Sequence, residues 1–62
     1  MQEGKTVKRV KVGQKGLHGK GLEPDENIGE EGIVIRDFSW KWMKIDIGGE
    51  AEWVRCEDFQ EV

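Results

Sequence analysis

The sequence of 62 residues predicts one all-β domain of five short strands. Apolar and polar side chains alternate along residues 40–47, and glycines interrupt the chain at short intervals. No segment keeps the 3.6-residue apolar period that is typical of an amphipathic helix. Because side chains on a strand alternate between two faces, alternation punctuated by glycine indicates short strands joined by turns. The chain is also too short for more than one domain.

The expected elements can be placed in chain order. Residues 1–6 have no apolar pattern and are expected to form a flexible tail, so the folded domain spans residues 7–62. The first strand is predicted over residues 7–12. Residues 13–27, dense in glycine, are predicted to form a long first loop, because glycine at this density disfavours regular structure. Later strands are predicted over residues 32–38, 40–47, 51–55 and 60–62.

Two local signals define the later connections. Gly48-Gly49 is a favoured two-residue hairpin turn, so residues 40–47 should pair antiparallel with residues 51–55. Residues 56–59 are too few for an α-helix and fit one 3₁₀ turn before the last strand. We expect Ile45 or Ile47 to contact Ala51 or Trp53 across the hairpin. The residues that the alternation assigns to the core are Val10, Val12, Ile33, Ile35, Met43, Ile45, Ile47 and Trp53.

This arrangement of strands, long first loop and 3₁₀ turn resembles the SH3-like small barrel with five strands. Within that superfold, residues 10–13, 29–35 and 44–48 resemble the KOW pattern. In that pattern a glycine starts a strand of small and β-branched residues, and a second strand follows. The adjacent acids Glu30 and Glu31 depart from that pattern, since its nucleic-acid-binding members favour neutral or basic residues there.

The charge is distributed unevenly along the chain. The net charge is −3 and the isoelectric point is about 5.1. Residues 1–22 carry six basic residues and one acid, whereas residues 23–62 carry four basic residues and twelve acids. Either the two parts attract each other on folding, or the basic side meets phosphate or an acidic protein. The low isoelectric point argues against a dedicated DNA-coating domain.

Residues 40–47 place two tryptophans on the face opposite the expected core. Trp40 and Trp42 share that face with Lys44 and Asp46. One explanation is that an indole folds into the barrel while the other covers an open end. The other is that the indoles contact a partner, and the resemblance implies this role, since SH3-like barrels bind peptides on aromatic side chains beside the first loop. We expect Trp42, between two charges, to keep substantial exposure.

Neither the glycine-rich segment nor the remaining reactive groups match a known phosphate-binding, metal-binding or catalytic motif. Lys15, His18 and Lys20 lie among exposed amides that suit phosphate, but the Walker A spacing fails at positions 14 and 21. Acids follow Cys56 and disfavour its thiolate, and one His with one Cys cannot supply a four-ligand zinc site. No pair of carboxylates has a spacing that marks an acid and a base. We therefore expect no enzyme, metal or cofactor.

The favoured function is a small non-catalytic module that binds another protein, as an accessory subunit. The residues expected to contact the partner are Trp40, Trp42, Lys44, Lys15, His18 and Lys20. One alternative is a KOW-like nucleic-acid-binding domain that uses the basic residues of segment 5–20. A less favoured one is an aromatic cage for methylated lysine. No signal peptide or membrane span is evident, so a cytoplasmic monomer without a small-molecule substrate is expected.

Overall fold

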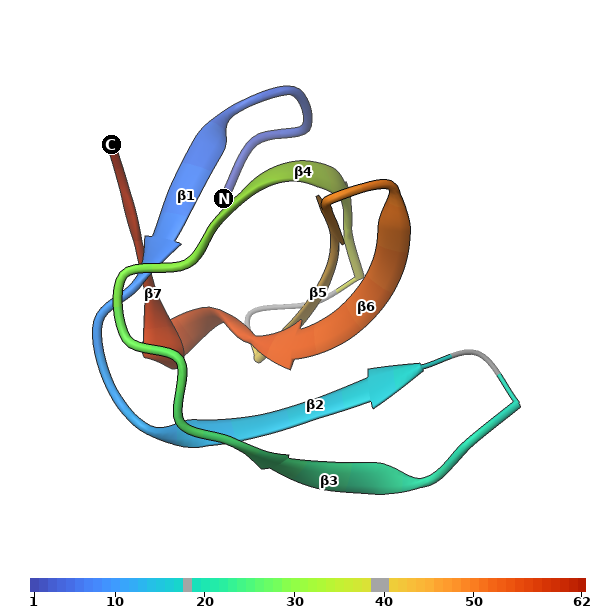
Figure 1. Cartoon of the computed structure of the whole chain (residues 1–62). Coiled ribbons are helices and arrows are strands. Elements are labelled where there is room, and N and C mark those ends of the chain that lie inside the picture. The colour runs from blue at the N-terminus through green and yellow to red at the C-terminus, as the bar shows by residue number, and fades with distance from the viewer. Residues whose placement is uncertain (18, 39–40) are drawn as a thin grey trace.

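The computed structural model describes residues 1–17, 19–38 and 41–62, and within them the chain is all-β, as predicted (Figure 1). The sheet has seven antiparallel strands rather than five, in the order β3-β2-β6-β5-β4-β1-β7. The strands are β1 (Thr6–Arg9), β2 (Gly13–Leu17), β3 (Leu22–Asp25), β4 (Glu31–Asp37), β5 (Trp42–Ile47), β6 (Glu50–Arg55) and β7 (Phe59–Glu61).

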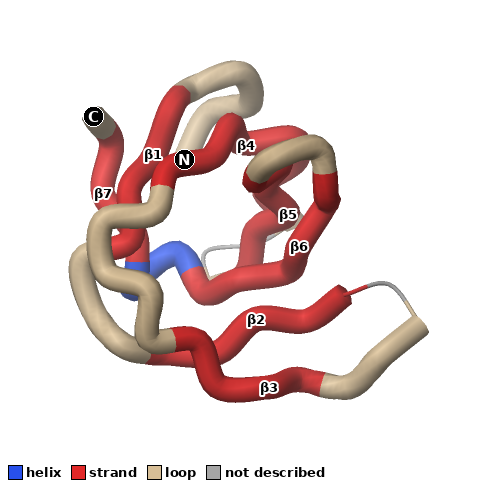
Figure 2. Tube along the Cα trace, in the orientation of Figure 1, coloured by secondary structure: helices blue, strands red, loops and turns tan. Residues whose placement is uncertain are grey.

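The sheet bends around a small core, and the hairpin β2–β3 extends along one side (Figures 1 and 2). The 3₁₀ turn Cys56–Asp58 precedes β7, which confirms the prediction for this segment. Ahead of β1, the Gly4 N–H donates to the carbonyl of Val34 at 2.8 Å, and the amino group of Met1 pairs with Asp37. The N-terminal residues thereby contact β4.

The two additional strands lie in the segment predicted to be a loop. β2 pairs with both β3 and β6, and Gly16 lies opposite Trp53. Pairing with β6 overrides the weak strand propensity of glycine. A Cβ on Gly16 would lie 3.0 Å from Cδ2 of Leu22, so a neighbouring side chain uses the space that glycine leaves. Pro24 is tolerated in β3 because β3 is an edge strand.

The core is smaller than the sequence pattern predicted. Met43 and Ile45 are fully buried, as predicted. Ile47 is only half-buried against the core. The residues that complete the core are Val7, Val34, Val54 and Phe59. Four predicted core residues are instead exposed, namely Val10, Val12, Ile33 and Ile35.

In β4 the inward residues are Gly32 and Val34, so Ile33 and Ile35 face outward. The remaining errors arise because charged side chains point inward from two other strands. In β1 the buried residues are Val7 and Arg9, and the strand ends at Arg9. Val10 and Val12 follow the strand and are exposed. In β6 the buried residues are Glu52 and Val54, which turns Trp53 to the other face. The assignment of Trp53 to the core was therefore wrong.

The hairpin after β5 confirms the predicted pairing but not the predicted contacts. Gly48 and Gly49 form the turn with φ of +61° and +90°, a region that favours glycine. The register pairs Ile45 with Glu52. It also pairs Ile47 with Glu50, so neither isoleucine lies directly opposite Ala51 or Trp53.

Arg9 connects four parts of the chain inside the fold. Its side chain is fully buried, and Nε donates to Oε1 of Glu30 at 2.9 Å. Nη2 lies 3.3 Å from Oδ2 of Asp25, and Nη1 lies 3.6 Å from Oδ2 of Asp58. The guanidinium carbon is 4.6 Å from the ring centroid of Phe59. One cation thus joins β1 to the end of β3, the residue before β4 and the 3₁₀ turn.

We predict that Ile45→Ala destabilises the domain by about 2–5 kcal/mol, because it opens a cavity in a core of few side chains. Ile33→Ala removes the same atoms from a side chain that is 52% exposed and should cost less than about 1 kcal/mol. Urea unfolding of both variants measures the difference. Equal losses of stability would contradict the inner position of Ile45.

We predict that Arg9→Leu costs about 3–5 kcal/mol at pH 7, because it leaves buried carboxylates without their cation. The exposed Arg36→Leu is the matched control and should change stability by less than about 1 kcal/mol. Thermal unfolding between pH 3 and pH 7 tests the cause. The cost should shrink in acid as the carboxylates are protonated, and a cost independent of pH would assign the effect to packing alone.

Candidate functional site

The outer face of the sheet, opposite the core, brings aromatic and cationic side chains together. In β5, Trp42, Lys44 and Asp46 lie on this face, as their alternation with Met43 and Ile45 predicted. The hairpin register then sets Trp53 opposite Lys44. It also sets Arg55 opposite Trp42. Directly opposed side chains on antiparallel strands are close enough to interact.

An irregularity in β4 adds a second cation to the same row. Ile33 lies opposite Asp46 and Val34 opposite Ile45, but the register then shifts by one residue. Arg36 consequently lies opposite Lys44. A bulge accommodates one extra residue on one strand and changes which side chain faces outward beyond it. Without this shift, Ile35 would occupy the position opposite Lys44.

Each cation on this surface lies over an aromatic ring. The guanidinium of Arg36 is 5.4 Å from the ring centroid of Phe38, and the ammonium of Lys44 is 5.8 Å from that of Trp53. The guanidinium of Arg55 is 5.0 Å from the ring of Trp42. The rings of Phe38 and Trp53 are 4.4 Å apart and inclined by 30°. We call these six residues the cation–aromatic face: Arg36, Phe38, Trp42, Lys44, Trp53 and Arg55.

The positive charge of this face is only partly compensated. Within residues 1–17, 19–38 and 41–62, neither Arg36 nor Lys44 forms an ion pair with a carboxylate. Arg55 Nη1 lies 3.9 Å from Oε1 of Glu57. Like charges directly opposite one another destabilise a strand pair, and the aromatic rings offset part of that repulsion. The face therefore presents cations for which an anionic ligand would be favourable.

The predicted site residues do not all lie together. Trp42 and Lys44 share the cation–aromatic face, although Trp42 is half-buried rather than substantially exposed. Lys15 lies in β2 opposite the core residue Val54, on the inner side of the sheet. Lys20 is exposed between β2 and β3. His18 and Trp40 lie outside the described residues.

Sequence reasoning missed four residues of the face, and two of them, Trp53 and Arg55, could have been found. Counting back from the Gly48-Gly49 turn pairs residue 47 with residue 50 and hence Lys44 with Trp53. That arithmetic would have moved Trp53 from the core to the outer face. Phe38 and Arg36 depend on the register shift in β4, which no local pattern indicated. Arg55 follows from the same counting as Trp53.

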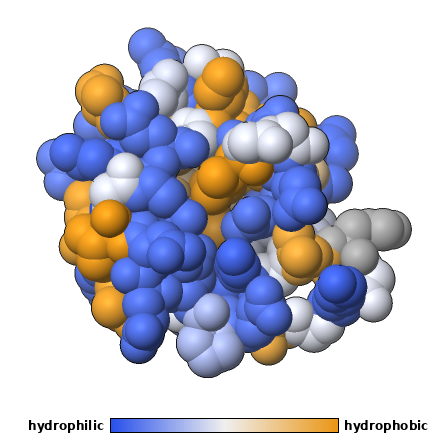
Figure 3. Space-filling model, in the orientation of Figure 1, coloured by the Kyte–Doolittle hydropathy of each residue, from blue (hydrophilic) through white to orange (hydrophobic). Residues whose placement is uncertain are grey.

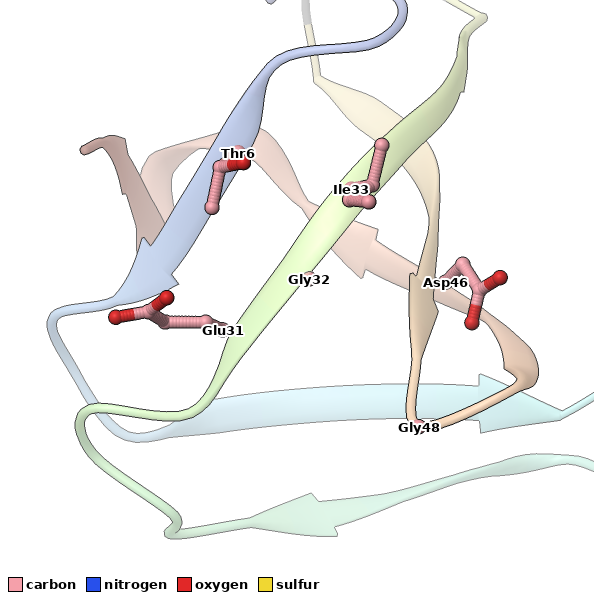
Figure 4. Close-up of a pocket in the computed structure, with 6 residues that line it drawn as sticks. All are labelled: Thr6, Glu31, Gly32, Ile33, Asp46 and Gly48. Atoms are coloured by element: carbon pink, nitrogen blue, oxygen red, sulfur yellow. The ribbon is translucent and has the colours of Figure 1, made fainter.

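A shallow depression of about 340 Å³ lies elsewhere on the outer face, across β1, β4 and β5. Its lining residues are Thr6, Glu31, Gly32, Ile33, Asp46 and Gly48 (Figure 4). The carboxylates of Glu31 and Asp46 point away from one another in Figure 4. The Asp46 carboxylate accepts a hydrogen bond from Gly49 N–H at 2.9 Å and so supports the turn. The depression does not bring an acid and a base together.

One side of the molecule, viewed as in Figure 1, is mostly polar (Figure 3). Its apolar residues form separate areas at the centre, along the left edge, at the top and at the lower right, with polar residues between them. The separate apolar areas on this side are of the kind that monomeric proteins ordinarily expose. The case for a binding site therefore depends on the chemistry of the cation–aromatic face.

The inner side of the sheet contains a buried carboxyl group, Glu52, that lacks a full set of hydrogen-bond partners within the described part of the chain. Glu52 is 5% exposed, and its Oε1 atom has no hydrogen-bond partner among the described residues. Burial raises the pKa of Glu52, and the charge of Lys15 opposes this effect. Burial and a hydrogen bond with Asp25 also raise the pKa of Glu30, although Arg9 acts in the opposite direction.

The pKa of Asp25 is shifted in the opposite direction to that of Glu30. Burial alone would raise the pKa of Asp25, but hydrogen bonds from Glu30 and from Asn27 N–H, with the charge of Arg9, lower it. In this pair Glu30 is therefore the group that first takes up a proton in acid. The arrangement neutralises Arg9 inside the fold and is structural in character.

Other kinds of site receive no support from the described part of the chain. It contains no group of three or more His, Cys, Asp or Glu side chains placed to hold a metal ion. Burial raises the pKa of the half-buried Cys56 thiol, which disfavours the nucleophilic thiolate. No helix in the described ranges has the length and apolar character needed to cross a membrane.

We predict that Glu52→Gln stabilises the domain at pH 7. Because the pKa of Glu52 is raised on folding, the folded state favours the protonated carboxyl, and this contribution is lost as the pH rises through the folded-state pKa. The gain in Tm should therefore shrink below about pH 4, near the ordinary pKa of a glutamate. The exposed Glu61→Gln should show little change, and an equal gain for Glu52→Gln at both pH values would reject the ionisation argument.

Comparison with known proteins gives no relative from which a function could be transferred. No protein-family model, curated protein or solved structure matches this chain. The cations and rings on the outer face of β4, β5 and β6 are therefore the features from which a function can be inferred.

Proposed function

We propose that this chain is a small non-catalytic interaction module that binds another protein through the cation–aromatic face. The observation that carries the proposal is the set of three cations, each lying over an aromatic ring on three adjacent strands. Tryptophan and arginine are enriched among residues that dominate binding energy in protein interfaces. Rigid rings also contribute contact area at a low cost in conformational entropy.

The hairpin β2–β3 extends the same binding surface. Gly16 lies opposite Trp53, and Leu22 lies opposite Gly16 on the next strand. Leu22 is 51% exposed, so an apolar side chain borders the aromatic rings. We propose that the partner contacts this hairpin as well, including His18 and Lys20, as peptide ligands do beside the first loop of SH3-like barrels.

We also propose that the fold is a variant of the SH3-like barrel. Three features support this assignment: β1 pairs with both β4 and β7, the first connection carries the β2–β3 hairpin, and a 3₁₀ turn precedes β7. On this proposal the module acts as a cytoplasmic accessory subunit, and the single cysteine is compatible with a reducing compartment.

Nucleic acid is the second candidate partner, because aromatic rings beside Arg and Lys also form platforms for single strands. Two observations weigh against it. The described rings of the face already hold cations, which compete with bases for the ring surfaces. Asp46 and Glu57 lie close to Lys44 and Arg55, where they would repel a phosphate chain.

We predict that affinity capture from cells that express this chain retains a protein whose recovery depends on the face. Trp53→Ala should reduce recovery by at least about tenfold, because loss of a central aromatic anchor commonly costs 2 kcal/mol or more. Lys44→Glu should act similarly while it leaves both tryptophans in place. The exposed Ile28→Ala is the control and should retain the protein.

Two outcomes would reject the protein-binding proposal. Equal recovery by wild type, Trp53→Ala and Lys44→Glu would mean that the face is not used. Recovery that disappears after nuclease treatment would favour the nucleic-acid alternative. Circular dichroism spectra of every variant should match wild type, so that loss of recovery is not loss of fold.

A further inference from the structure

We propose that the partner supplies an acidic extended segment whose carboxylates bind Arg36 and Lys44. This inference rests on the proposed function of the cation–aromatic face and specifies the chemistry of its ligand. The two cations lie directly opposite one another on β4 and β5. Neither has a carboxylate partner among residues 1–17, 19–38 and 41–62. A bound carboxylate would relieve their repulsion.

The placement of Arg36 opposite Lys44 is a consequence of the fold rather than of a flexible surface. The register shift after Val34 places Arg36 opposite Lys44, where a regular strand would have placed Ile35. Their rings, Phe38 and Trp53, pack against each other at 4.4 Å and so support the cations side by side. Side chains held in this way lose less entropy on binding than free surface cations.

The spacing of the cations favours an extended ligand with acids at alternate positions. Arg55 lies diagonally across from Lys44, because it pairs with Trp42 on the same strand. Diagonal neighbours on a sheet are about 7–8 Å apart, and alternate residues of an extended chain are about 6.6–7 Å apart. When one carboxylate of the partner lies at Arg36 and Lys44, a second carboxylate two positions further along can therefore reach Arg55. Guanidinium groups additionally bind carboxylates through two parallel hydrogen bonds.

The surroundings of the cations limit the charge of the ligand. Asp46 lies two residues from Lys44 on the same strand, and Glu57 lies 3.9 Å from Arg55. The whole chain also carries a net charge of −3. A polyphosphate backbone would have to cross these acids, whereas a short segment can place its few carboxylates on the cations and apolar side chains on Trp53 and Leu22. The face therefore favours a protein segment that mixes acids with apolar residues.

The test is a titration of the isotope-labelled chain with a short peptide of alternating Glu and Leu, followed by NMR. We expect shifts in the indole N–H signals of Trp42 and Trp53 and in the amides of Arg36 and Lys44. The matched peptide with Gln in place of Glu should bind at least about tenfold more weakly. Raising NaCl from about 50 to about 500 mM should weaken binding of the acidic peptide, since exposed ion pairs are screened.

Charge-reversal variants locate the contact. Arg36→Glu and Lys44→Glu should each abolish the shifts, whereas Lys5→Glu makes the same change in net charge outside the face and should leave them unchanged. Equal affinity for the Glu and Gln peptides, or no binding of either, would overturn the acidic-ligand inference. If the cell-derived protein still depended on Trp53 in that case, the proposed protein-binding function would stand with a different ligand chemistry.

Two other ligands of the cation–aromatic face, nucleic acid and a second copy of this chain, would give different results. Oligothymidylate that bound more tightly than the acidic peptide and shifted the same signals would assign the face to nucleic acid instead. Self-association that depended on chain concentration and was abolished by Lys44→Glu would assign the face to a second copy of this chain. Size-exclusion chromatography over a range of concentrations measures that association, and either result would reject the inference.

Discussion

The buried guanidinium of Arg9 is the interaction on which the rest of the fold depends. A domain of this length has little apolar volume, and the six buried apolar side chains among residues 1–17, 19–38 and 41–62 form a small core. Arg9 supplements that core by connecting segments that the sheet alone does not join, from the end of β3 to the 3₁₀ turn. Removing a charge of this kind leaves its partners buried and unpaired, so the network is sensitive to single changes.

The same network imposes a strict requirement on a nearby glycine. A Cβ at residue 13 would lie 2.0 Å from Oδ2 of Asp58 and 3.1 Å from Nη1 of Arg9. Gly13 opens β2, so the entry of the chain into the β2–β3 hairpin is set by the position of Asp58. The hairpin that borders the cation–aromatic face is thus fixed in part by a charge contact on the opposite side of the sheet.

The sequence predicted the all-β class, the Gly48-Gly49 hairpin and the 3₁₀ turn, because local signals determine each of them. It predicted which β5 residues face the core for the same reason. It failed in β1 and β6, where Arg9 and Glu52 are buried and invert the expected relation between charge and exposure. It failed in β2 because glycine content is a local property, whereas pairing with β6 is a contact between distant residues.

The candidate site was accessible to sequence reasoning only in part. Trp42 and Lys44 were found from alternation, and Trp53 would have followed from the hairpin register. Arg36 could not be found in this way, because Ile33-Val34-Ile35 is a continuous apolar run that does not reveal which residue faces inward. The structure resolves the ambiguity through Val34, which is buried opposite Ile45.

In a regular strand, the residue that faces the core determines which residues face outward. The bulge in β4 removes this coupling. Up to Val34, the inward residue of β4 is constrained by the core; beyond the bulge, Arg36 lies opposite Lys44 on the outer face. Deleting Ile35 would leave Val34 opposite Ile45 and the arginine opposite Lys44, but the local bend that a bulge produces would be lost. Evolution or design can therefore alter the curvature of this surface through one residue while its charges and the packing beneath it stay the same.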